Sequence, residues 1–402
     1  MSFEIARSGI AAVNGSLETI SHNIANTGTY GYKSSRANFS AMYAGTQANG
    51  AEVSSVTQNI GKAGGALNTG GSMDAMIQGS GFFAVRDGMG ETVFTRVGLF
   101  NVDKDGYVID TLGRKLQGNN AVLDANGQPV AGAGLGAFGD LRVGSTQVGA
   151  AASDKLNLNG NLSADWSVPA TTPFDMTDAT TYNSSVTSVV YDSQGAKHAL
   201  TQYFVKTGSN QAEVYYSFDG STPAAAANAT LSFGTDGTLA GASTATFTAS
   251  PAGVDPINLT IDYKGTTQYA SDTTTLTNAA NGNAAGTLTG TSLADDGSVI
   301  ATYSNGKQQR LGTVALANFA NPFALQAVSD TSWKATPDSG TALYSQPGTS
   351  MTGSLAVGSV EQSNVDITSQ LVDLMSAQRN YQANTKVIST ESQVMQALMQ
   401  AI

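Results

Sequence analysis

Glycine and proline are distributed unevenly along this chain of 402 residues, and this limits which segments can be helical. The chain contains 45 glycines and 9 prolines, and all the prolines lie between Pro129 and Pro347. After Gly358 neither residue occurs again. Glycine costs a helix about 1 kcal/mol relative to alanine, and proline about 3 kcal/mol. We therefore predict one long helix over 366–402, capped at its start by Asn364 or Asp366.

Hydrophobic side chains in this predicted helix repeat every seven residues. One row of the repeat consists of Leu374, Tyr381, Ile388, Met395 and Ile402. The companion row is polar in the middle and consists of Leu371, Gln378, Thr385, Ser392 and Met399. A stable two-stranded coiled coil is apolar in both rows. We expect a helical partner that leaves part of the companion row hydrated or hydrogen-bonded.

The N-terminal segment offers a matching apolar stripe. Its members recur in steps of three and four and are Phe3, Ala6, Ile10, Val13, Leu17, Ile20 and Ile24. This spacing predicts a helix, which Asn26, Gly28 and Gly31 end. Alone in water such a helix is marginally stable, so it needs a partner. Two core faces of one globular bundle would give the same stripes, but their position at opposite chain ends favours a terminal pair used for assembly.

The region between the predicted helices has the pattern of short β-strands separated by tight turns. Strands are predicted at 82–86, 92–96, 99–102, 107–110, 188–191, 198–206, 214–218 and 230–233, with a further β region over 298–345. Residues 31–72 are irregular and polar, which predicts a linker or extended arm. Residues 221–250 and 272–292 are rich in Ala, Thr, Ser and Gly and predict exposed loops or edge strands. The fold class expected is α+β and multidomain.

Composition excludes several classes of function. The net charge is -11 and no basic block occurs, so we expect no nucleic-acid partner. There is no Cys, which rules out disulfides and thiol chemistry. No apolar run is long enough to span a membrane, so no membrane insertion is expected. The first residues lack the pattern of a signal peptide, and any export would use a route without a cleaved signal.

Three patterns resemble chemical sites but are weak. Residues 134–139 match G-x-G-x-x-G, yet the following sequence is strand-like and not helical. Residues 101–112 resemble the start of a calcium loop, but Leu112 stands where a bidentate Glu is required. The only histidines are His22 and His198, which do not form a metal-binding pattern. We predict no catalytic residue, no cofactor and no metal site.

Two longer stretches carry a family resemblance. Residues 21–33, SHNIANTGTYGYK, resemble the N-terminal signature shared by flagellar rod and hook proteins, and residues 363–384 are similar to their C-terminal signature. Residues 76–83 with 94–98, and 311–322, are similar to the common domain of this family. The signature residues quoted for this resemblance are Asn23, Ala25, Asn26, Gly31, Tyr32, Lys33, Asn364, Asp366, Gln378, Arg379 and Tyr381.

The resemblance implies a nested domain organisation. Residues 1–30 and 364–402 would form an inner domain, a coiled-coil pair of terminal helices that lines the channel of a helical tube. Residues 73–146 and 286–363 would form an inner β domain. Residues 147–285 would form an outer β domain inserted in it, and both would be of β-barrel or sandwich type. Such an outer domain is a feature of hook members, whereas rod members are shorter.

The resemblance also implies a function. The chain is expected to be a secreted structural subunit that forms a flexible hook, transmits torque and provides an export channel. Expected partners are further copies of itself, the distal rod, the hook cap, the hook-filament junction proteins and the flagellar export apparatus. The helix seams named above would carry the assembly contacts. The alternatives are a distal rod or other axial component, or a monomeric β-rich surface protein.

Overall fold

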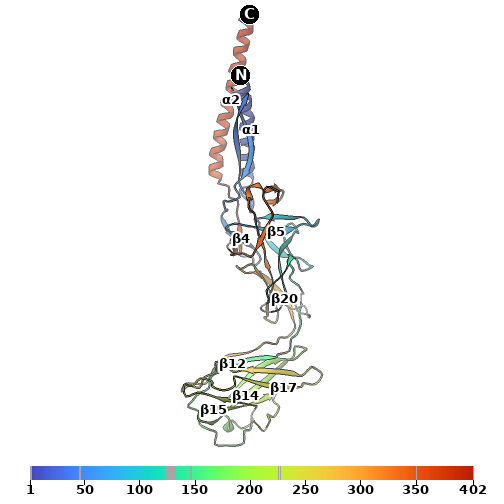
Figure 1. Ribbon diagram of the computed structural model, residues 1–402, viewed down its shortest axis with the longest axis vertical. Helices are drawn as coiled ribbons and strands as arrows, with labels where there is room; N and C mark the ends of the chain where they lie inside the picture. Colours follow the sequence, from blue (N-terminus) through green and yellow to red (C-terminus); the bar gives the residue numbers. More distant parts are fainter. Residues whose placement is uncertain are drawn as a thin grey trace. The chain divides into compact units, whose positions relative to one another are not determined.

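The computed structural model describes residues 2–44, 47–122, 130, 133–144, 147–224, 226, 228–349 and 351–401. Within them, strands are the main secondary structure and a long helix lies at each end, blue and red in Figure 1. The prediction of a mostly β chain with terminal helices is confirmed. The chain divides into two compact units: unit 1 comprises Met1–Ser145, Gly290–Thr302 and Gln308–Ile402, and unit 2 comprises Thr146–Thr289 and Tyr303–Lys307.

The two helices of unit 1 lie side by side and run antiparallel (Figure 1). Helix α1 spans Ser2–Ala25 and helix α2 spans Ile367–Ala401, close to the predicted bounds. Gly9 of α1 faces Asn384 of α2 so closely that a Cβ added to the glycine would lie 2.9 Å from the amide nitrogen. Near the other end of α1, Asn23 Nδ2 donates a hydrogen bond to Gln370 Oε1 at 2.9 Å.

Side-chain hydrogen bonds explain where the helices begin and end. Asp366 caps α2, because its Oδ1 accepts hydrogen bonds from the N–H groups of Thr368 at 2.9 Å and Ser369 at 3.2 Å. Asn364, the other predicted cap, is used elsewhere. At the C-terminal end of α1, Asn26 Nδ2 donates to the carbonyl oxygen of His22 at 2.9 Å.

A long β-hairpin packs along α1, where the sequence predicted a linker or extended arm. Strands β1 (Ser35–Ala44) and β2 (Gln47–Gln58) pair antiparallel. Val53 of β2 fits against Gly15 of α1, where an added Cβ would lie 2.9 Å from the valine side chain. The register shifts at Asn38/Phe39 and at Met42/Tyr43, which indicates bulges. These shifts interrupt the alternation of apolar and polar residues that would identify the strands.

The β part of unit 1 is a sheet built around an aromatic core. Strands β22, β9, β5, β6, β25 and β24 follow one another in the sheet. Phe94 packs edge-on against Phe319 with ring centroids 4.7 Å apart, and Phe82 lies 5.5 Å from Trp333. The strands of this part are β3 (Ala66–Asn68), β4 (Ala75–Gln78), β5 (Phe82–Arg86), β6 (Thr92–Thr95), β7 (Phe100–Val102), β8 (Val108–Asp110), β9 (Lys115–Ala121), β10 (Leu135–Asp140), β22 (Gln308–Val314), β23 (Leu316–Asn318), β24 (Gln326–Val328), β25 (Ser332–Lys334), β26 (Leu343–Ser345), β27 (Ser354–Val357) and β28 (Ser359–Glu361).

Unit 2 is a sandwich of two sheets around its own hydrophobic core. One sheet has the order β13-β14-β15-β16 and the other β17-β18-β12-β19. Core residues include Leu156, Phe204 and Leu259, and come from both sheets. The strands are β11 (Gln147–Val148), β12 (Lys155–Asn161), β13 (Ser184–Tyr191), β14 (Lys197–Gly208), β15 (Gln211–Phe218), β16 (Ala229–Ser232), β17 (Thr244–Ala249), β18 (Ile257–Asp262) and β19 (Thr274–Ala280). Strands β20 (Gly286–Leu293) and β21 (Ser298–Tyr303) each contain residues of both units.

The predicted strands agree with the observed ones to within a few residues. The low-information stretches contribute the edge strands β17 and β19, so the prediction of exposed loops or edge strands is confirmed for these two segments. Strand β17 alternates exposed and half-buried residues, whereas β19 is exposed over most of its length. A large uncharged surface therefore remains open on this sandwich.

Candidate assembly site: the helix pair and the junction at its base

Helix α1 lies between α2 and the β-hairpin. Of the predicted stripe, Ala6 and Ile20 are buried, with 3% and 7% of their surface exposed. Ile10, Val13, Leu17 and Ile24 are half-buried. Phe3 is 44% exposed, because it lies in the first turn of the helix. The stripe is thus covered along its middle and open at its N-terminal end.

The seam of α2 differs in part from the predicted one. Leu374 and Ile388 are half-buried, Tyr381 and Met395 are exposed, and Ile402 lies outside the described residues. The predicted companion row does not pack against α1 within this chain: Leu371, Gln378, Thr385, Ser392 and Met399 are all exposed. The row that is at least half-buried instead consists of Gln370, Ala377, Asn384 and Glu391.

The chemistry of α1 explains this choice of row. Gly9 has no side chain, so the Asn384 side chain of α2 can approach the backbone of α1 closely at this point. Asn23 offers an amide donor, which the Gln370 side chain accepts. Ala377 is the buried residue of α2 among those described, at 6% exposed, and its small side chain permits close approach of the helices. Large apolar side chains such as Leu371 are therefore directed away from α1.

Much of the apolar surface of α2 has no partner within this chain. Exposure reaches 58% at Leu398 and 70% at Met399. The exposed apolar residues of α2 are Ile367, Leu371, Val372, Met375, Tyr381, Val387, Val394, Met395, Leu398 and Met399. Contiguous exposed apolar surface of this kind marks an interaction site. A 35-residue helix with so little buried surface is not built to be stable alone.

Asn23 organises the base of the helix pair. Its Oδ1 accepts hydrogen bonds from the Ser35 N–H at 2.8 Å and from the Tyr32 hydroxyl at 3.3 Å. Its Nδ2 donates to the Ser35 carbonyl at 2.8 Å as well as to Gln370. One buried amide therefore joins α1, the start of the hairpin and the start of α2. An Asp at this position would lose both donated hydrogen bonds.

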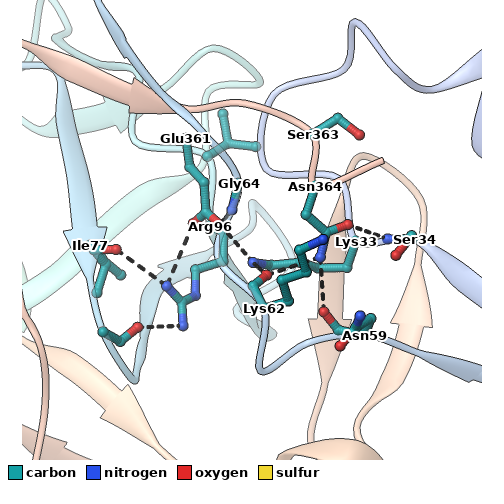
Figure 2. Close-up of polar contacts among 12 residues, drawn as sticks. Lys33, Ser34, Asn59, Lys62, Gly64, Ile77, Arg96, Glu361, Ser363 and Asn364 are labelled. Atoms are coloured by element: carbon teal, nitrogen blue, oxygen red, sulfur yellow. Dashed lines mark hydrogen bonds and ion pairs between the residues drawn. The ribbon is translucent and has the colours of Figure 1, made fainter. Parts of the chain in front are cut away.

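A buried ion cluster connects segments far apart in sequence (Figure 2). The Lys33 Nζ donates to Glu361 Oε1 at 2.6 Å and to the carbonyl oxygen of Lys62 at 2.8 Å. The Arg96 Nη1 lies 3.5 Å from Glu361 Oε2, and its Nη2 donates to the carbonyl oxygen of Gly79 at 2.9 Å. The side chains of Lys33 and Glu361 have no exposed surface, and that of Arg96 is 5% exposed. We call these three residues the junction cluster.

Burial and charge act in opposite directions in this cluster. Burial lowers the pKa of Lys33 from its ordinary value, and the Glu361 carboxylate opposes that shift. Burial also lowers the pKa of Arg96, again opposed by Glu361. The Arg96 guanidinium lies 5.1 Å from the centre of the Phe82 ring, and its Nε has no hydrogen-bond partner among the described atoms. Glu361 is therefore the single carboxylate that balances two buried cations.

Asn364 links the segment before α2 by hydrogen bonds to the segment after α1 (Figure 2). Its Oδ1 accepts a hydrogen bond from the Ser34 N–H at 2.7 Å. Its Nδ2 donates to the carbonyl oxygens of Asn59 at 3.0 Å and Lys62 at 2.9 Å. The segment before α2 is thus held by the same loop that receives Lys33.

The other signature residues divide into two groups. Gly31 has φ +67 and donates its N–H to the Glu361 carbonyl at 2.8 Å; an added Cβ would lie 3.1 Å from the Val97 nitrogen, so only glycine fits there. Ala25, Gln378, Arg379 and Tyr381 are exposed and take no part in the junction. Sequence reasoning did not select Arg96 or Glu361, although Glu361 directly follows the apolar Val360.

The patterns that suggested chemical sites have structural roles. Residues 134–139 fall in or next to β10, which pairs with β9, so no helix begins there. Asp103 Oδ1 accepts from the N–H groups of Asp105 and Tyr107 and stabilises the turn between β7 and β8. His22 is exposed on α1. In the part of the chain that the structure describes, no group of three or more potential ligands could hold a metal ion, and no helix is long and apolar enough to cross a membrane.

His198 lies in a separate polar cluster in unit 2. Its Nδ1 is 2.6 Å from Asp219 Oδ2, and its Nε2 is 3.4 Å from Asp192 Oδ2. The hydrogen bond with Asp219 raises the pKa of His198, although partial burial opposes the shift. The Phe218 ring stacks on the imidazole with centroids 4.9 Å apart. Both carboxylates hold the imidazole in place at the ends of neighbouring strands.

Comparisons with known proteins cover almost the whole chain. Three family models match: Flagellar hook protein FlgE/F/G D1 domain over residues 76–150, Flagellar basal body protein FlaE D2 domain over 157–283, and Flagellar basal body rod FlgEFG protein C-terminal over 356–401. The flagellar hook protein FlgE of Escherichia coli (strain K12) is 35% identical over 99% of both chains. That of Brucella suis biovar 1 is 31% identical over 99% of this chain and 98% of its own.

The fold also occurs in a solved structure of a flagellar hook protein. The crystal structure of the Helicobacter pylori flagellar hook protein FlgE2 matches with a TM-score of 0.53 and 12% sequence identity. The match covers 72% of this chain and 98% of that chain. At this identity the likeness concerns the fold alone.

Proposed function

This chain belongs to the flagellar hook protein family, and on that premise we propose that its terminal helices carry the contacts by which copies join into a tube. As a family member it is a structural subunit that polymerises with itself into the hook of the bacterial flagellum. The observation that supports the proposed contacts is the apolar surface of α2 that stays exposed in the single chain. Fully burying one Leu or Met side chain contributes roughly 1.5–3 kcal/mol.

The proposal gives the helices two states. In the monomer, α2 buries little surface, so the helix pair frays easily. In the tube, neighbouring copies cover the exposed residues, and the gain offsets the conformational entropy lost on ordering. Such a chain would remain soluble and easily unfolded for export before it assembles. The predicted coiled-coil character of the helix pair belongs to this assembled state.

The wall of the channel is proposed to be neutral and polar. Gln382, Gln393, Gln396 and Gln400 are exposed on α2 and carry no charge, so they would not retain a passing unfolded chain electrostatically. Asn384 is also an uncharged polar residue of α2, but it contacts Gly9 of α1 and is therefore left out of this set. The matching test replaces several of these glutamines by Glu and measures export of later subunits, which should fall.

The finer role follows from the nested domains. We assign the helices to the inner domain, the β part of unit 1 to the inner β domain and unit 2 to the outer β domain. The uncharged surfaces of the outer β domains of neighbouring copies would slide over one another when the hook bends as a universal joint. The expected partners are the distal rod, the hook cap, the hook-filament junction proteins and the export apparatus. Export without a cleaved signal and absence of catalysis are part of the same proposal.

The test compares two pairs of charges on α2. In the full chain, Val387→Asp with Val394→Asp places charges on exposed apolar positions, and Gln382→Asp with Thr390→Asp places the same charges on exposed polar ones. Electron microscopy at high protein concentration should show tubes from the wild-type chain and the polar-position control only. Tubes from the Val387/Val394 variant at the wild-type yield would contradict the proposed contacts.

A further inference from the structure

A groove opens beside the base of the helix pair. It has a volume of about 750 Å³ and lies between α1, α2 and the β-hairpin. Val13, Ile20 and Ala377 come from the helices, Ala37 and Phe39 from β1, and Phe323 from the β part of unit 1. Phe39 is 53% exposed and Phe323 is 64% exposed. Apolar side chains therefore border a space that this chain does not fill.

The far end of α2 extends beyond its partner helix. Gly9 faces Asn384 and Asn23 contacts Gln370, so the helices are antiparallel. The N-terminal end of α1 therefore lies beside Glu391 of α2. Every residue over 392–400 is exposed, and Figure 1 shows the C-terminal end of α2 beyond the N-terminal end of α1. We call residues 392–401 the C-terminal overhang. Its apolar members are Val394, Met395, Ala397, Leu398, Met399 and Ala401.

We infer that the groove receives the C-terminal overhang of a second copy of this chain. The lengths agree: the groove follows α1 from Val13 to Asn23, about 15 Å at 1.5 Å per residue, and the overhang is also about 15 Å long. The chemistry agrees as well. The overhang combines apolar with uncharged polar side chains, and so does the groove lining, in which only Arg36 and Asp373 are charged.

The overhang cannot enter the groove of its own chain. Helix α2 contributes to both surfaces, because its Ala377 borders the groove and its Met399 lies in the overhang. Along a continuous helix these residues are about 33 Å apart. The occupant must therefore come from another molecule.

The geometry of such a contact matches an open polymer. Groove and overhang are different surfaces, so each copy offers one and receives the other. Contacts of this heterologous kind generate rings when the rotation closes and open helical assemblies when it does not. The inference rests on the proposed assembly through the helices and adds which segments meet. It also gives a reason for the length of α2, which exceeds that of α1.

The absence of Cys from the chain allows a direct test. The full-length double variant S16C/M399C places one thiol on the α1 residues that line the groove and one on the overhang, and S376C/M399C uses a lining residue of α2 instead. A disulfide forms only when the two Cα atoms approach within about 7 Å. The matched control N14C/M399C uses an exposed position of α1 outside the groove lining.

Tubes of each variant are oxidised and examined on a non-reducing gel. We expect a ladder of covalent multimers from both groove pairs, at least tenfold stronger than from the control pair. Tubes without a ladder from either groove pair, or with an equal ladder from the control, would overturn the inference and leave the proposed assembly through the helices in place. If the wild-type chain forms no tubes, that proposed assembly fails and this inference fails with it.

Discussion

At the scale of single residues, the junction cluster shows that one buried carboxylate balances two buried cations. Lys33 comes from the segment after α1, Arg96 directly follows β6, and Glu361 ends β28, the last strand before α2. A buried charge left without its partner is costly, because desolvation is no longer compensated. Glu361 therefore contributes to the attachment of both helices to the β part of unit 1, and its loss should lower the stability of the whole unit.

We predict that Glu361→Gln lowers the free energy of unfolding of unit 1 by about 3–5 kcal/mol, since it leaves Lys33 and Arg96 buried without a counter-charge. Urea unfolding followed by the fluorescence of Trp333, in a Trp166→Phe background, measures this. The control is Glu91→Gln, which breaks the partly exposed ion pair with Lys334 at 2.7 Å and should cost at most about 1 kcal/mol. Equal effects of the two substitutions would refute the role given to Glu361.

At the scale of elements, the contact between α1 and α2 depends on the small size of Gly9. An added Cβ would lie 2.9 Å from the Asn384 amide nitrogen, and a larger side chain would separate the helices. We predict that Gly9→Leu lowers the free energy of unfolding by about 1–3 kcal/mol and makes α2 more sensitive to proteolysis. Ala11→Leu adds side-chain volume on an exposed position of the same helix and should leave both measurements unchanged or slightly improved. If the Gly9→Leu and Ala11→Leu variants behave alike, close packing at this point is not what holds the pair together.

The elements that depend on local sequence were predictable, whereas those that depend on distant contacts were not. Helix α2 was located because breakers are absent from it, and strands such as β5 because Gly and Asp mark their ends. The hairpin β1–β2 was missed because bulges near Phe39 and Tyr43 interrupt its alternation.

The candidate site was predicted only in part, for the same physical reason. The signature drew attention to Asn23, Lys33 and Asn364, whose hydrogen bonds lie at the junction. The choice of Gln370 over Leu371 for the helix contact depends on Gly9 and Asn23 of the other helix. Glu361 was missed since glutamate is usually exposed, and only the meeting of distant segments buries it.

At the scale of the whole molecule, each unit has its own hydrophobic core and its own reporter. The chain contains 2 tryptophans: Trp333 is buried in the core of unit 1, and Trp166 packs against the core of unit 2. Separate cores imply separate unfolding transitions, so a perturbation confined to one unit should be visible in one fluorescence signal only. His198 provides such a perturbation, because it lies in unit 2 and its hydrogen bond with Asp219 raises its pKa above the ordinary value.

The raised pKa of His198 determines the sign of the expected pH dependence. A His in an unfolded chain has a pKa of about 6.5, and the hydrogen bond with Asp219 raises the pKa in the folded unit. The stabilisation is therefore fully present below about pH 6.5 and is lost as the pH rises through the higher folded value. Asp192 and Asp219 have lowered pKa values, because hydrogen bonds together outweigh their desolvation, and their contribution changes only in acid. Between about pH 6 and 8 the change in stability with pH that this cluster causes therefore comes mainly from the histidine.

We predict that raising the pH from about 6 to about 8 lowers the urea midpoint reported by Trp166, measured in a Trp333→Phe background, and that His198→Asn removes this part of the change. The difference between the wild-type and His198→Asn chains should be absent from the Trp333 signal in a Trp166→Phe background, because unit 1 does not contain the cluster. A difference of equal size in both signals would mean that the units unfold together. If the urea midpoint reported by Trp166 does not change with pH in the chain that retains His198, the ion pairs of His198 contribute nothing to stability. Independent transitions would show that each unit is stabilised by its own core, and that the junction cluster and the His198 cluster act on different units.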